Sequence, residues 1–489
     1  LAWVLGRAAR VREAFALGFA WGFGAFIGGV SWLYVALERY GGMPAPLAAL
    51  AIALFCAYLA LYPGLAGAAF VSLQRRIGAR SARAGGAGGG AVGAGLRAKA
   101  ADELAMFAGE PAPTGTASTA PPVRSAALFA AIWLLSEWLR GVVFTGFPWL
   151  AIGYSQTPPS PLGGLLPVIG VYGVGGVVAF VGALLAFTPR ADWLRPRRIW
   201  RLALTVALLF AAGAGLLGRS WTTPIGQPLQ VALVQTNFEQ SLKWDPARFA
   251  DVLQANLDLV RETFMQPQPP ALVVLPETTL PTLLDRLPEG YLDWPAQLAR
   301  EAGGNLVMGV FRRDEAGQIF NAAVSLGTAP VQHYAKQHLV PFQEGLPATE
   351  VAPSLAAALH PLAQHGRAHW FTASREDPLQ LPQVRRRGDA QQPTAIAPLL
   401  CFEILFPATL AQRVRQGAQL VIWQTNDEDA QAGHYAYQFA QFARLRAVET
   451  GRDIVRVNTD GDHQHIDAAM AGRDGVHGRD DVGVHRNVH

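Results

Sequence analysis

The C-terminal half of the chain carries one cysteine, Cys401. It ends an apolar run and is followed two residues later by the carboxylate of Glu403. The second cysteine, Cys56, falls in a strongly apolar stretch that indicates a membrane-buried position. A thiol without a disulfide partner is either a small core side chain or a reactive group. Taken alone, Cys401 favours the core interpretation, because free cysteines are usually buried for packing.

A glutamate and a lysine elsewhere in the sequence favour the reactive interpretation of Cys401 instead. Glu277 follows the apolar run 272–276, which predicts a buried parallel strand, and would lie at its carboxyl end, where sites in α/β sheets gather. Lys336 lies in a mostly irregular segment that also carries Glu344. Each charge alone is typical of a protein surface. Together with Cys401 they supply what thiol acyl transfer needs: a base for the thiol proton, a cation for the thiolate and oxyanion, and a nucleophilic sulfur.

The composition indicates a membrane protein. The chain has 489 residues, of which 51% are hydrophobic and only 16% are charged, and this is too apolar for an ordinary soluble protein. Five stretches are long enough to cross roughly 30 Å of hydrocarbon. They comprise about residues 14–37, 47–73, 126–143, 165–187 and 199–217. In the first stretch, we expect the glycines to allow close helix packing; they are Gly22, Gly24, Gly28 and Gly29.

Basic residues predict how the chain is oriented. Arginines and lysines precede the first stretch, follow the second and flank the connection from the fourth to the fifth, whereas residues 38–46 and 144–164 carry only Arg39. By the positive-inside rule the basic connections are cytoplasmic. Five crossings then place everything after about residue 220 on the side of the membrane away from the cytoplasm. The net charge of +4 reflects this topology and does not indicate nucleic-acid binding.

The chain divides into three parts by its patterns. Residues 1–220 form a predicted membrane domain that contains a low-complexity cytoplasmic connection at about 76–123. From 228 to 460, strand-like and helical stretches alternate, which predicts a layered α/β domain. We expect strands at 229–235, 272–275, 305–310, 320–326 and 420–424, and helices at 246–263, 291–302, 408–416 and 435–449.

Several separate blocks resemble the apolipoprotein N-acyltransferase family, a membrane-embedded branch of the nitrilase (carbon–nitrogen hydrolase) superfamily. The blocks are residues 21–24, 32–35, 40–44, 136–141, 145–150, 153–156 and 240–245, followed by the segments around Glu277, Lys336 and Cys401. The resemblance implies an αββα sandwich with Glu277 as base, Lys336 as oxyanion donor and Cys401 as nucleophile. It implies no cofactor and no metal.

The resemblance also implies substrates and supporting residues. Its reaction moves a fatty acyl chain from a phospholipid, through a cysteine thioester, to the N-terminal amine of diacylglyceryl-modified lipoproteins. Residues at matching positions around the site are Trp244, Glu344, Phe402 and Glu403, where Phe402 replaces the usual tyrosine. Trp244 is equally consistent with a loop that contacts the acyl chain and with simple packing on the domain.

Three departures from the family pattern stand out. The family pattern would place two membrane helices ahead of residue 14, which we do not expect in this sequence, and we expect residues 428–433 to replace an aromatic contact. From residue 461 onward, histidines lie among Asp, Arg and Gly without a strand pattern; they are His463, His465, His477, His485 and His489. We expect the tail 461–489 to be disordered or frame-shifted, which would leave an unpaired sheet edge.

Two alternatives remain open at this stage. A membrane-anchored nitrilase-type amidase would use the same glutamate, lysine and cysteine, although the Trp- and Gly-rich helices favour lipid substrates. A truncated, inactive relative acting as a binding protein would explain the altered tail, but the intact Glu277, Lys336 and Cys401 oppose it.

Overall fold

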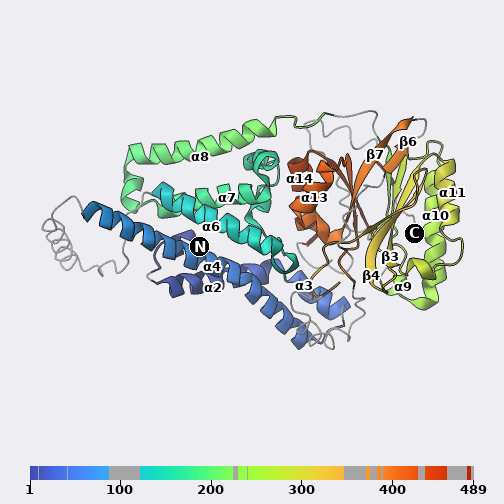
Figure 1. Cartoon of the computed structure of the whole chain (residues 1–489), viewed down its shortest axis with the longest axis horizontal. Helices are drawn as coiled ribbons and strands as arrows, with labels where there is room; N and C mark the ends of the chain where they lie inside the picture. Colours follow the sequence, from blue (N-terminus) through green and yellow to red (C-terminus); the bar gives the residue numbers. More distant parts are fainter. Residues whose placement is uncertain are drawn as a thin grey trace. The chain divides into compact units, whose positions relative to one another are not determined.

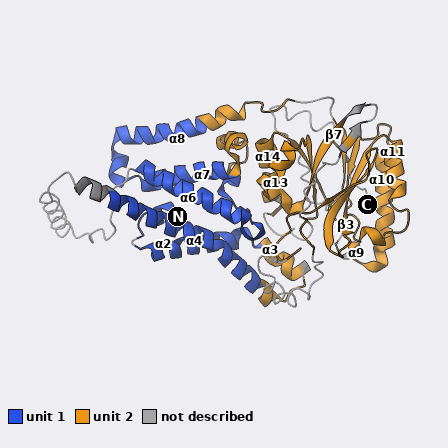
Figure 2. Ribbon diagram, in the orientation of Figure 1, with its two compact units in different colours: residues 1–31, 49–155, 172–211 blue, residues 32–48, 156–171, 212–489 orange. Residues whose placement is uncertain are grey.

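The computed structural model describes residues 1–8, 10–40, 42–86, 122–223, 229–238, 240–345, 371–374, 383–386, 389–427, 435–459 and 482–485. The chain divides into two compact units (Figure 2). One comprises residues 1–31, 49–155 and 172–211, and the other comprises 32–48, 156–171 and 212–489. Two segments from the N-terminal half therefore fold with the α/β part, which a simple division near residue 220 does not anticipate.

Long apolar helices dominate the N-terminal half. They are α2 (Val11–Gly29), α4 (Ala45–Gly86), α6 (Pro122–Val142), α7 (Leu166–Phe187) and α8 (Pro196–Leu217), after the short α1 (Ala2–Leu5). Within the described residues, four helical stretches are long and apolar enough to cross a membrane: Ala45–Arg80, Pro122–Thr145, Pro161–Phe187 and Pro196–Leu217. They correspond to the second to fifth predicted stretches.

The first predicted stretch, 14–37, is not one straight helix. Helix α2 ends at Gly29, and the chain continues through α3 (Trp32–Val35) and a π-helical turn, η1 (Ala36–Tyr40). The two parts are bent by 55°. The break falls at Val30, whose backbone is non-helical (φ −121°, ψ 16°). The apolar pattern runs through this break, so hydropathy alone could not reveal it.

Two of the four α2 glycines expected to allow close packing do so, and two do not. A Cβ on Gly22 would lie 2.3 Å from Pro63 Cγ, and one on Gly29 would lie 2.1 Å from Leu150 Cδ1. Close packing is thus confirmed at these positions, seven residues apart on one face of the helix. It is wrong for Gly24 and Gly28, where a Cβ would meet no atom of the described residues within 4 Å.

Buried polar groups join two of the sequence blocks in the helical unit. Arg140 of α6 is 3% exposed and donates to the carbonyl oxygens of Phe147 at 2.6 Å and Trp149 at 2.5 Å. Glu137, one turn earlier, accepts from the Ile152 N–H at 2.8 Å. The blocks 136–141 and 145–150 are therefore one structural element, in which a helix positions the loop that follows it.

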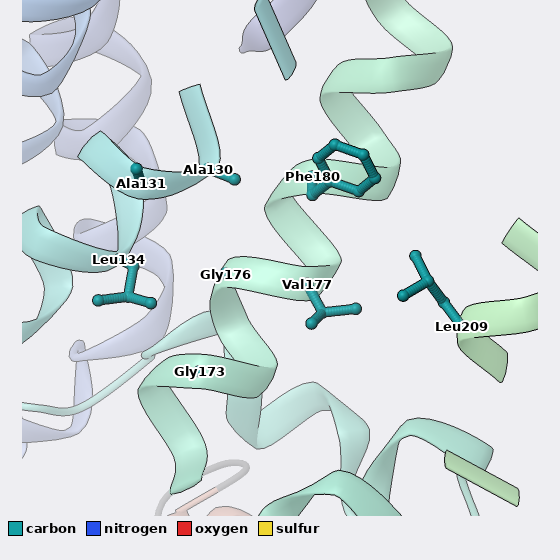
Figure 3. A pocket seen from close by; sticks show the side chains of 8 residues that line it. All are labelled: Ala130, Ala131, Leu134, Gly173, Gly176, Val177, Phe180 and Leu209. Carbon is teal, nitrogen blue, oxygen red and sulfur yellow. The ribbon is translucent and has the colours of Figure 1, made fainter. Parts of the chain in front are cut away.

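An apolar cavity of about 220 Å³ also lies in this unit, between α6, α7 and α8 (Figure 3). It is lined by Ala130, Ala131, Leu134, Gly173, Gly176, Val177, Phe180 and Leu209. None of these side chains is an acid, a base or a nucleophile, so the cavity is not a candidate catalytic site.

The second unit contains two β-sheets. The first has the order β10-β1-β2-β3-β4-β5, in which β10, β1, β2 and β3 run parallel and β4 and β5 are antiparallel to their neighbours. Its strands are β1 (Val231–Val234), β2 (Leu272–Val274), β3 (Asn305–Arg313), β4 (Ile319–Gly327), β5 (Gln332–Ala335) and β10 (Val482–His485).

The second sheet has the order β6-β7-β8-β9. Strand β6 is antiparallel to β7, and β7, β8 and β9 are parallel. These strands are β6 (Gln383–Arg386), β7 (Asp389–Leu400), β8 (Leu420–Thr425) and β9 (Asp453–Asn458).

Helices cover the outer face of each sheet (Figure 1). Helices α10 (Phe249–Phe264) and α11 (Asp293–Glu301) cover the first sheet, and α13 (Pro407–Arg415) and α14 (Tyr435–Thr450) cover the second. Val273 of β2 packs in the helix-facing core, whereas its neighbours Leu272 and Val274 belong to a second core that also contains Ile422 of the other sheet. Burial on both faces explains why β2 is apolar throughout. The predicted αββα sandwich is confirmed.

The tail contributes one strand that the sequence did not predict. Strand β10 pairs in parallel with β1, with Val231 opposite Val482 and Val234 opposite His485. The expectation of no strand in 461–489 is therefore wrong for Val482–His485, and β1 is not left as an edge. An edge strand offers a row of unpaired N–H and C=O groups, which any extended segment can satisfy. The rest of the tail, including His463, and the segment 428–433 lie outside the described residues.

Candidate active site

Three residues that could act as base, cation or nucleophile lie just after the carboxyl ends of strands. Glu277 is the third residue after β2, Lys336 immediately follows β5, and Cys401 immediately follows β7. Backbone contacts fix the first of these turns, since the Leu275 N–H donates to the Val307 carbonyl at 2.9 Å and the Gly309 N–H to the Pro276 carbonyl at 3.1 Å. Strand ends thus supply all three groups, as predicted for Glu277.

A buried charge cluster forms around Lys336. Its Nζ lies 2.9 Å from Glu277 Oε1 and 2.9 Å from Glu344 Oε1, and its side chain is 1% exposed. Asn321 of β4 donates to the same two oxygens, at 2.7 Å and 2.9 Å. Glu344 is held further by the Val340 N–H at 2.8 Å. One ammonium and one amide therefore hold two carboxylates together in the interior.

Burial and the neighbouring charges shift the pKa values of Lys336 and Glu277. Burial alone would lower the pKa of Lys336, but Glu277 and Glu344 outweigh it and raise that pKa well above 10.5. Lys336 is therefore an ammonium at neutral pH. Burial raises the pKa of Glu277 above 4.5; the Lys336 ammonium opposes this shift and the Glu344 carboxylate adds to it.

Cys401 occupies a strained position beside the cluster. It begins the 3₁₀ turn η8 (Cys401–Leu405) with φ +45°, in the left-handed region that few non-glycine residues adopt. The indole N–H of Trp423 fixes the turn by donating to the Cys401 carbonyl at 2.8 Å. Burial raises the pKa of the thiol well above 9.0; the charge of Glu277 raises it further and that of Lys336 lowers it. The resting thiol is therefore protonated, and it requires a base to react.

Glu403 connects the loops of Lys336 and Cys401. It is fully buried, and its Oε1 accepts from the Gln337 N–H at 2.7 Å while its Oε2 accepts from the Leu400 N–H at 2.9 Å. The hydroxyl of Tyr334 lies 2.7 Å from both oxygens. The carboxylate thus binds one backbone N–H next to Lys336 and another next to Cys401.

Replacing Glu403 with alanine should destabilise the protein markedly. It would leave the Tyr334 hydroxyl and three backbone N–H groups without this acceptor, those of Gln337, His338 and Leu400. Each such group costs about 1–3 kcal/mol where it is buried, so we expect a loss of about 3 kcal/mol or more. Glu403→Gln, which keeps the size and an acceptor oxygen, should lose less. Thermal unfolding of both variants in detergent tests this. An alanine variant as stable as wild type would contradict the linking role.

The remaining predicted positions are packed into the domain. Trp244 stacks on Phe311, with ring centroids 5.8 Å apart. Phe402 is 1% exposed and meets Phe406 edge-on at 5.5 Å. Next to Trp244, Lys243 donates to Thr278 Oγ1 at 2.7 Å, which ties this segment to the residue after Glu277. Contact of Trp244 or Phe402 with substrate stays a prediction.

Two site residues were not singled out from the sequence. Asn321 lies within the predicted strand 320–326, where it and Ser325 are the two polar residues, and this was the available signal. Tyr435 was placed only as the start of a helix, yet its hydroxyl lies 3.9 Å from Cys401 Sγ. Asn321 contacts residues 44 and 23 positions away, and Tyr435 contacts one 34 positions away.

The αββα unit thus holds a buried glutamate, lysine and cysteine just after the ends of its strands. Residues 230–475 match the carbon-nitrogen hydrolase family model, and residues 1–184 match that of the apolipoprotein N-acyltransferase N-terminal domain. The chain therefore belongs to the apolipoprotein N-acyltransferase family.

Individual relatives agree with this assignment. The chain is 35% identical over 451 residues to an apolipoprotein N-acyltransferase of Nitrosomonas europaea, covering 92% of this chain and 77% of the relative. It is 34% identical to that of Chromobacterium violaceum, covering 92% and 75%. Among solved structures, Nit3 of Saccharomyces cerevisiae, a nitrilase-superfamily member, is 15% identical, covering 49% of this chain and 79% of that chain, with a TM-score of 0.34.

Proposed function

We propose that this chain transfers a fatty acyl chain from a membrane phospholipid, through a thioester on Cys401, to the N-terminal amine of diacylglyceryl-modified apolipoproteins. The observation that carries the proposal is the buried ammonium of Lys336, bound to Glu277 and Glu344 beside the Cys401 thiol. It occurs in a chain that matches both domains of the apolipoprotein N-acyltransferase family.

In the first half-reaction, Glu277 removes the thiol proton of Cys401. Lys336 and Asn321 both donate to Oε1 of Glu277, so we assign the proton to Oε2. The thiolate attacks the ester carbonyl of the phospholipid, and Lys336 stabilises the oxyanion that forms. The carbon–oxygen bond then breaks, Glu277 returns its proton to the leaving oxygen of the lysophospholipid, and the acyl group remains on sulfur.

In the second half-reaction, the amine of the lipoprotein attacks the thioester. Glu277 takes one proton from the nitrogen, the carbon–sulfur bond breaks, and an amide forms. The sulfur leaves as a thiolate and recovers the proton from Glu277. Water must stay away from the thioester, and the buried position of Cys401, which is 7% exposed, supports its exclusion.

The setting for this reaction is a membrane. Four apolar helices of sufficient length within the described residues support a membrane protein. The apolipoprotein N-acyltransferase relatives are bacterial, so we assign the chain to the bacterial inner membrane, and the distribution of arginine and lysine supports an α/β unit in the periplasm. The amidase alternative is not favoured, because the chain also matches the N-terminal domain model. The inactive relative is not favoured either, since Glu277, Lys336 and Cys401 lie together.

A direct assay distinguishes these possibilities. The purified chain is incubated in detergent micelles with phospholipid and a peptide that carries an N-terminal diacylglyceryl-cysteine. We expect the peptide to gain the mass of one acyl chain and an equal amount of lysophospholipid to appear. Cys401→Ala should give neither product. Hydrolysis of small amides without acyl transfer to the peptide would overturn the proposal in favour of an amidase.

Replacing Glu344 with glutamine should move the pH profile of the reaction. The Glu344 carboxylate raises the pKa of Glu277, so its removal should lower that pKa. Because a base must be deprotonated to act, the acid limb of kcat/KM should move to lower pH. Glu301→Gln, an exposed change on α11, is the control and should leave the profile unchanged. An acid limb that moves to higher pH in Glu344→Gln would contradict the assignment of Glu277 as base.

A further inference from the structure

Tyr435 places a phenol next to the reactive sulfur. It is the first residue of α14, is 5% exposed, and its hydroxyl lies 3.9 Å from Cys401 Sγ. The same hydroxyl lies 3.5 Å from Asp427 Oδ1, to which it donates. Asp427 is in turn paired with Arg456 of β9. One hydroxyl proton therefore has two acceptors within reach, a carboxylate and the nucleophile.

Aromatic packing holds this phenol in place. The Tyr435 ring contacts Phe439 of the same helix at 4.4 Å between centroids and Trp32 at 4.8 Å. Trp32 is 6% exposed and belongs to the segment 32–48, which folds in the same compact unit as α14. The ring is thus buried between two aromatic side chains, so the hydroxyl has little freedom beyond rotation about its C–O bond.

A second contact fixes the other end of α14. The Val171 N–H donates to Glu449 Oε1 at 2.9 Å, and Val171 ends the segment 156–171 of the same unit. The preceding residue, Gly170, has φ +64°, and a Cβ there would lie 2.9 Å from the same oxygen. Two segments from the N-terminal half therefore hold the helix that presents Tyr435 to Cys401.

The hydroxyl is a donor throughout the working pH range. Burial raises the pKa of Tyr435 well above 10.0, and the charges of Cys401 and Asp427 raise it further. A neutral phenol can donate to a thiolate, and bonds to charged acceptors are stronger than bonds between neutral groups. The groups whose charges act on the sulfur are Glu277, Lys336, Asp427 and Glu344, and of these only Lys336 favours the thiolate.

We propose that Tyr435 is a further catalytic residue, whose hydroxyl turns from Asp427 to Cys401 and donates a hydrogen bond to the thiolate. The phenol keeps its proton, and no bond to carbon or sulfur forms or breaks at Tyr435. The thiol proton still goes to Glu277. Tyr435 would act twice, when the thiolate forms before acylation and when it leaves during transfer to the amine. This role rests on the proposed function only in naming those two steps.

The test measures the reactivity of Cys401 without any acyl substrate. Wild type and Tyr435→Phe, which keeps the packed ring, are alkylated with iodoacetamide in detergent over a range of pH. The adduct on Cys401 is quantified by peptide mass spectrometry. Because the variant lacks the donor, its thiolate is less stable, the pKa of the thiol rises, and the profile moves to higher pH. We expect roughly tenfold slower alkylation at neutral pH.

A matched control lies two residues along the same helix. Tyr437 is 63% exposed, and Tyr437→Phe should alkylate with the wild-type profile. Thermal unfolding of both variants verifies that each is folded. Trp32→Phe changes the ring beside Tyr435 but leaves the Tyr435 hydroxyl in place, so this second variant should retain most of the reactivity of Cys401. A wild-type profile in folded Tyr435→Phe would overturn the proposal. Since this readout needs no phospholipid, it stands or falls separately from acyl transfer.

Discussion

Replacing Glu277 with glutamine is expected to slow acylation of Cys401 by about 10²–10⁴-fold while the protein stays folded. Glutamine has the size of glutamate, and its carbonyl oxygen can still accept from Lys336 and Asn321, which both donate to Oε1. What disappears is the ability to take a proton. Burial, the largest cause of the raised pKa of Cys401, remains in the variant, so the thiol still needs a base to react.

A charge-conserving variant of Glu277 tests whether the position of the carboxylate matters as well as its basicity. Glu277→Asp keeps a carboxylate but withdraws it by one methylene, and misplacement on this scale is enough to impair catalysis severely. Acylation rates for Glu277→Gln and Glu277→Asp should be measured by mass spectrometry in phospholipid micelles, with unfolding temperatures as the control. Near-normal activity in Glu277→Asp would contradict the role assigned to Glu277.

Replacing Lys336 with methionine should both abolish acyl transfer and destabilise the protein. It leaves the carboxylates of Glu277 and Glu344 buried without their cation, and breaking a buried ion pair from one side costs about 3–5 kcal/mol. The loss should depend on pH. Lys336 lowers the pKa of Glu277, so without it that pKa rises further, and the carboxylate takes up a proton as the pH falls. The deficit should therefore be large at neutral pH and shrink in acid.

Unfolding temperatures of wild type and Lys336→Met at neutral and mildly acidic pH measure this dependence. The double variant Lys336→Met/Glu344→Gln, which removes the cation and one carboxylate, should recover part of the stability and none of the activity. An equal deficit at both pH values would indicate that lost packing, and not uncompensated charge, explains the destabilisation.

Local sequence patterns predicted much of the fold. The apolar run before Pro276 predicted β2 because this strand is buried on both faces, and α10 and α11 follow apolar periodicity closely. The bend after α2 was missed, because it depends on the backbone of Val30 and leaves the hydropathy unchanged. Strand β10 was missed because a four-residue segment gains its conformation from pairing with β1, far away in the sequence.

In the active site, too, some residues were predicted from the sequence and others were missed. Glu277, Lys336 and Cys401 were predicted because residue type and chain order indicate their chemistry. The amide of Asn321, which contacts both carboxylates, and the phenol of Tyr435 were not, since only the folded chain brings them there. Phe402 is a partial case: its position next to Cys401 was apparent, but its packing against Phe406 depends on the turn that begins at φ +45°.

The most direct test of the account is a search for the acyl thioester on Cys401. The purified chain is incubated with phospholipid in detergent and without an amine acceptor, and peptides that contain Cys401 are analysed by mass spectrometry. We expect one acyl chain on this cysteine, removed by hydroxylamine and absent from Cys401→Ala. A folded protein that carries no such adduct, although phospholipid is present, would contradict the proposed acyl transfer through Cys401.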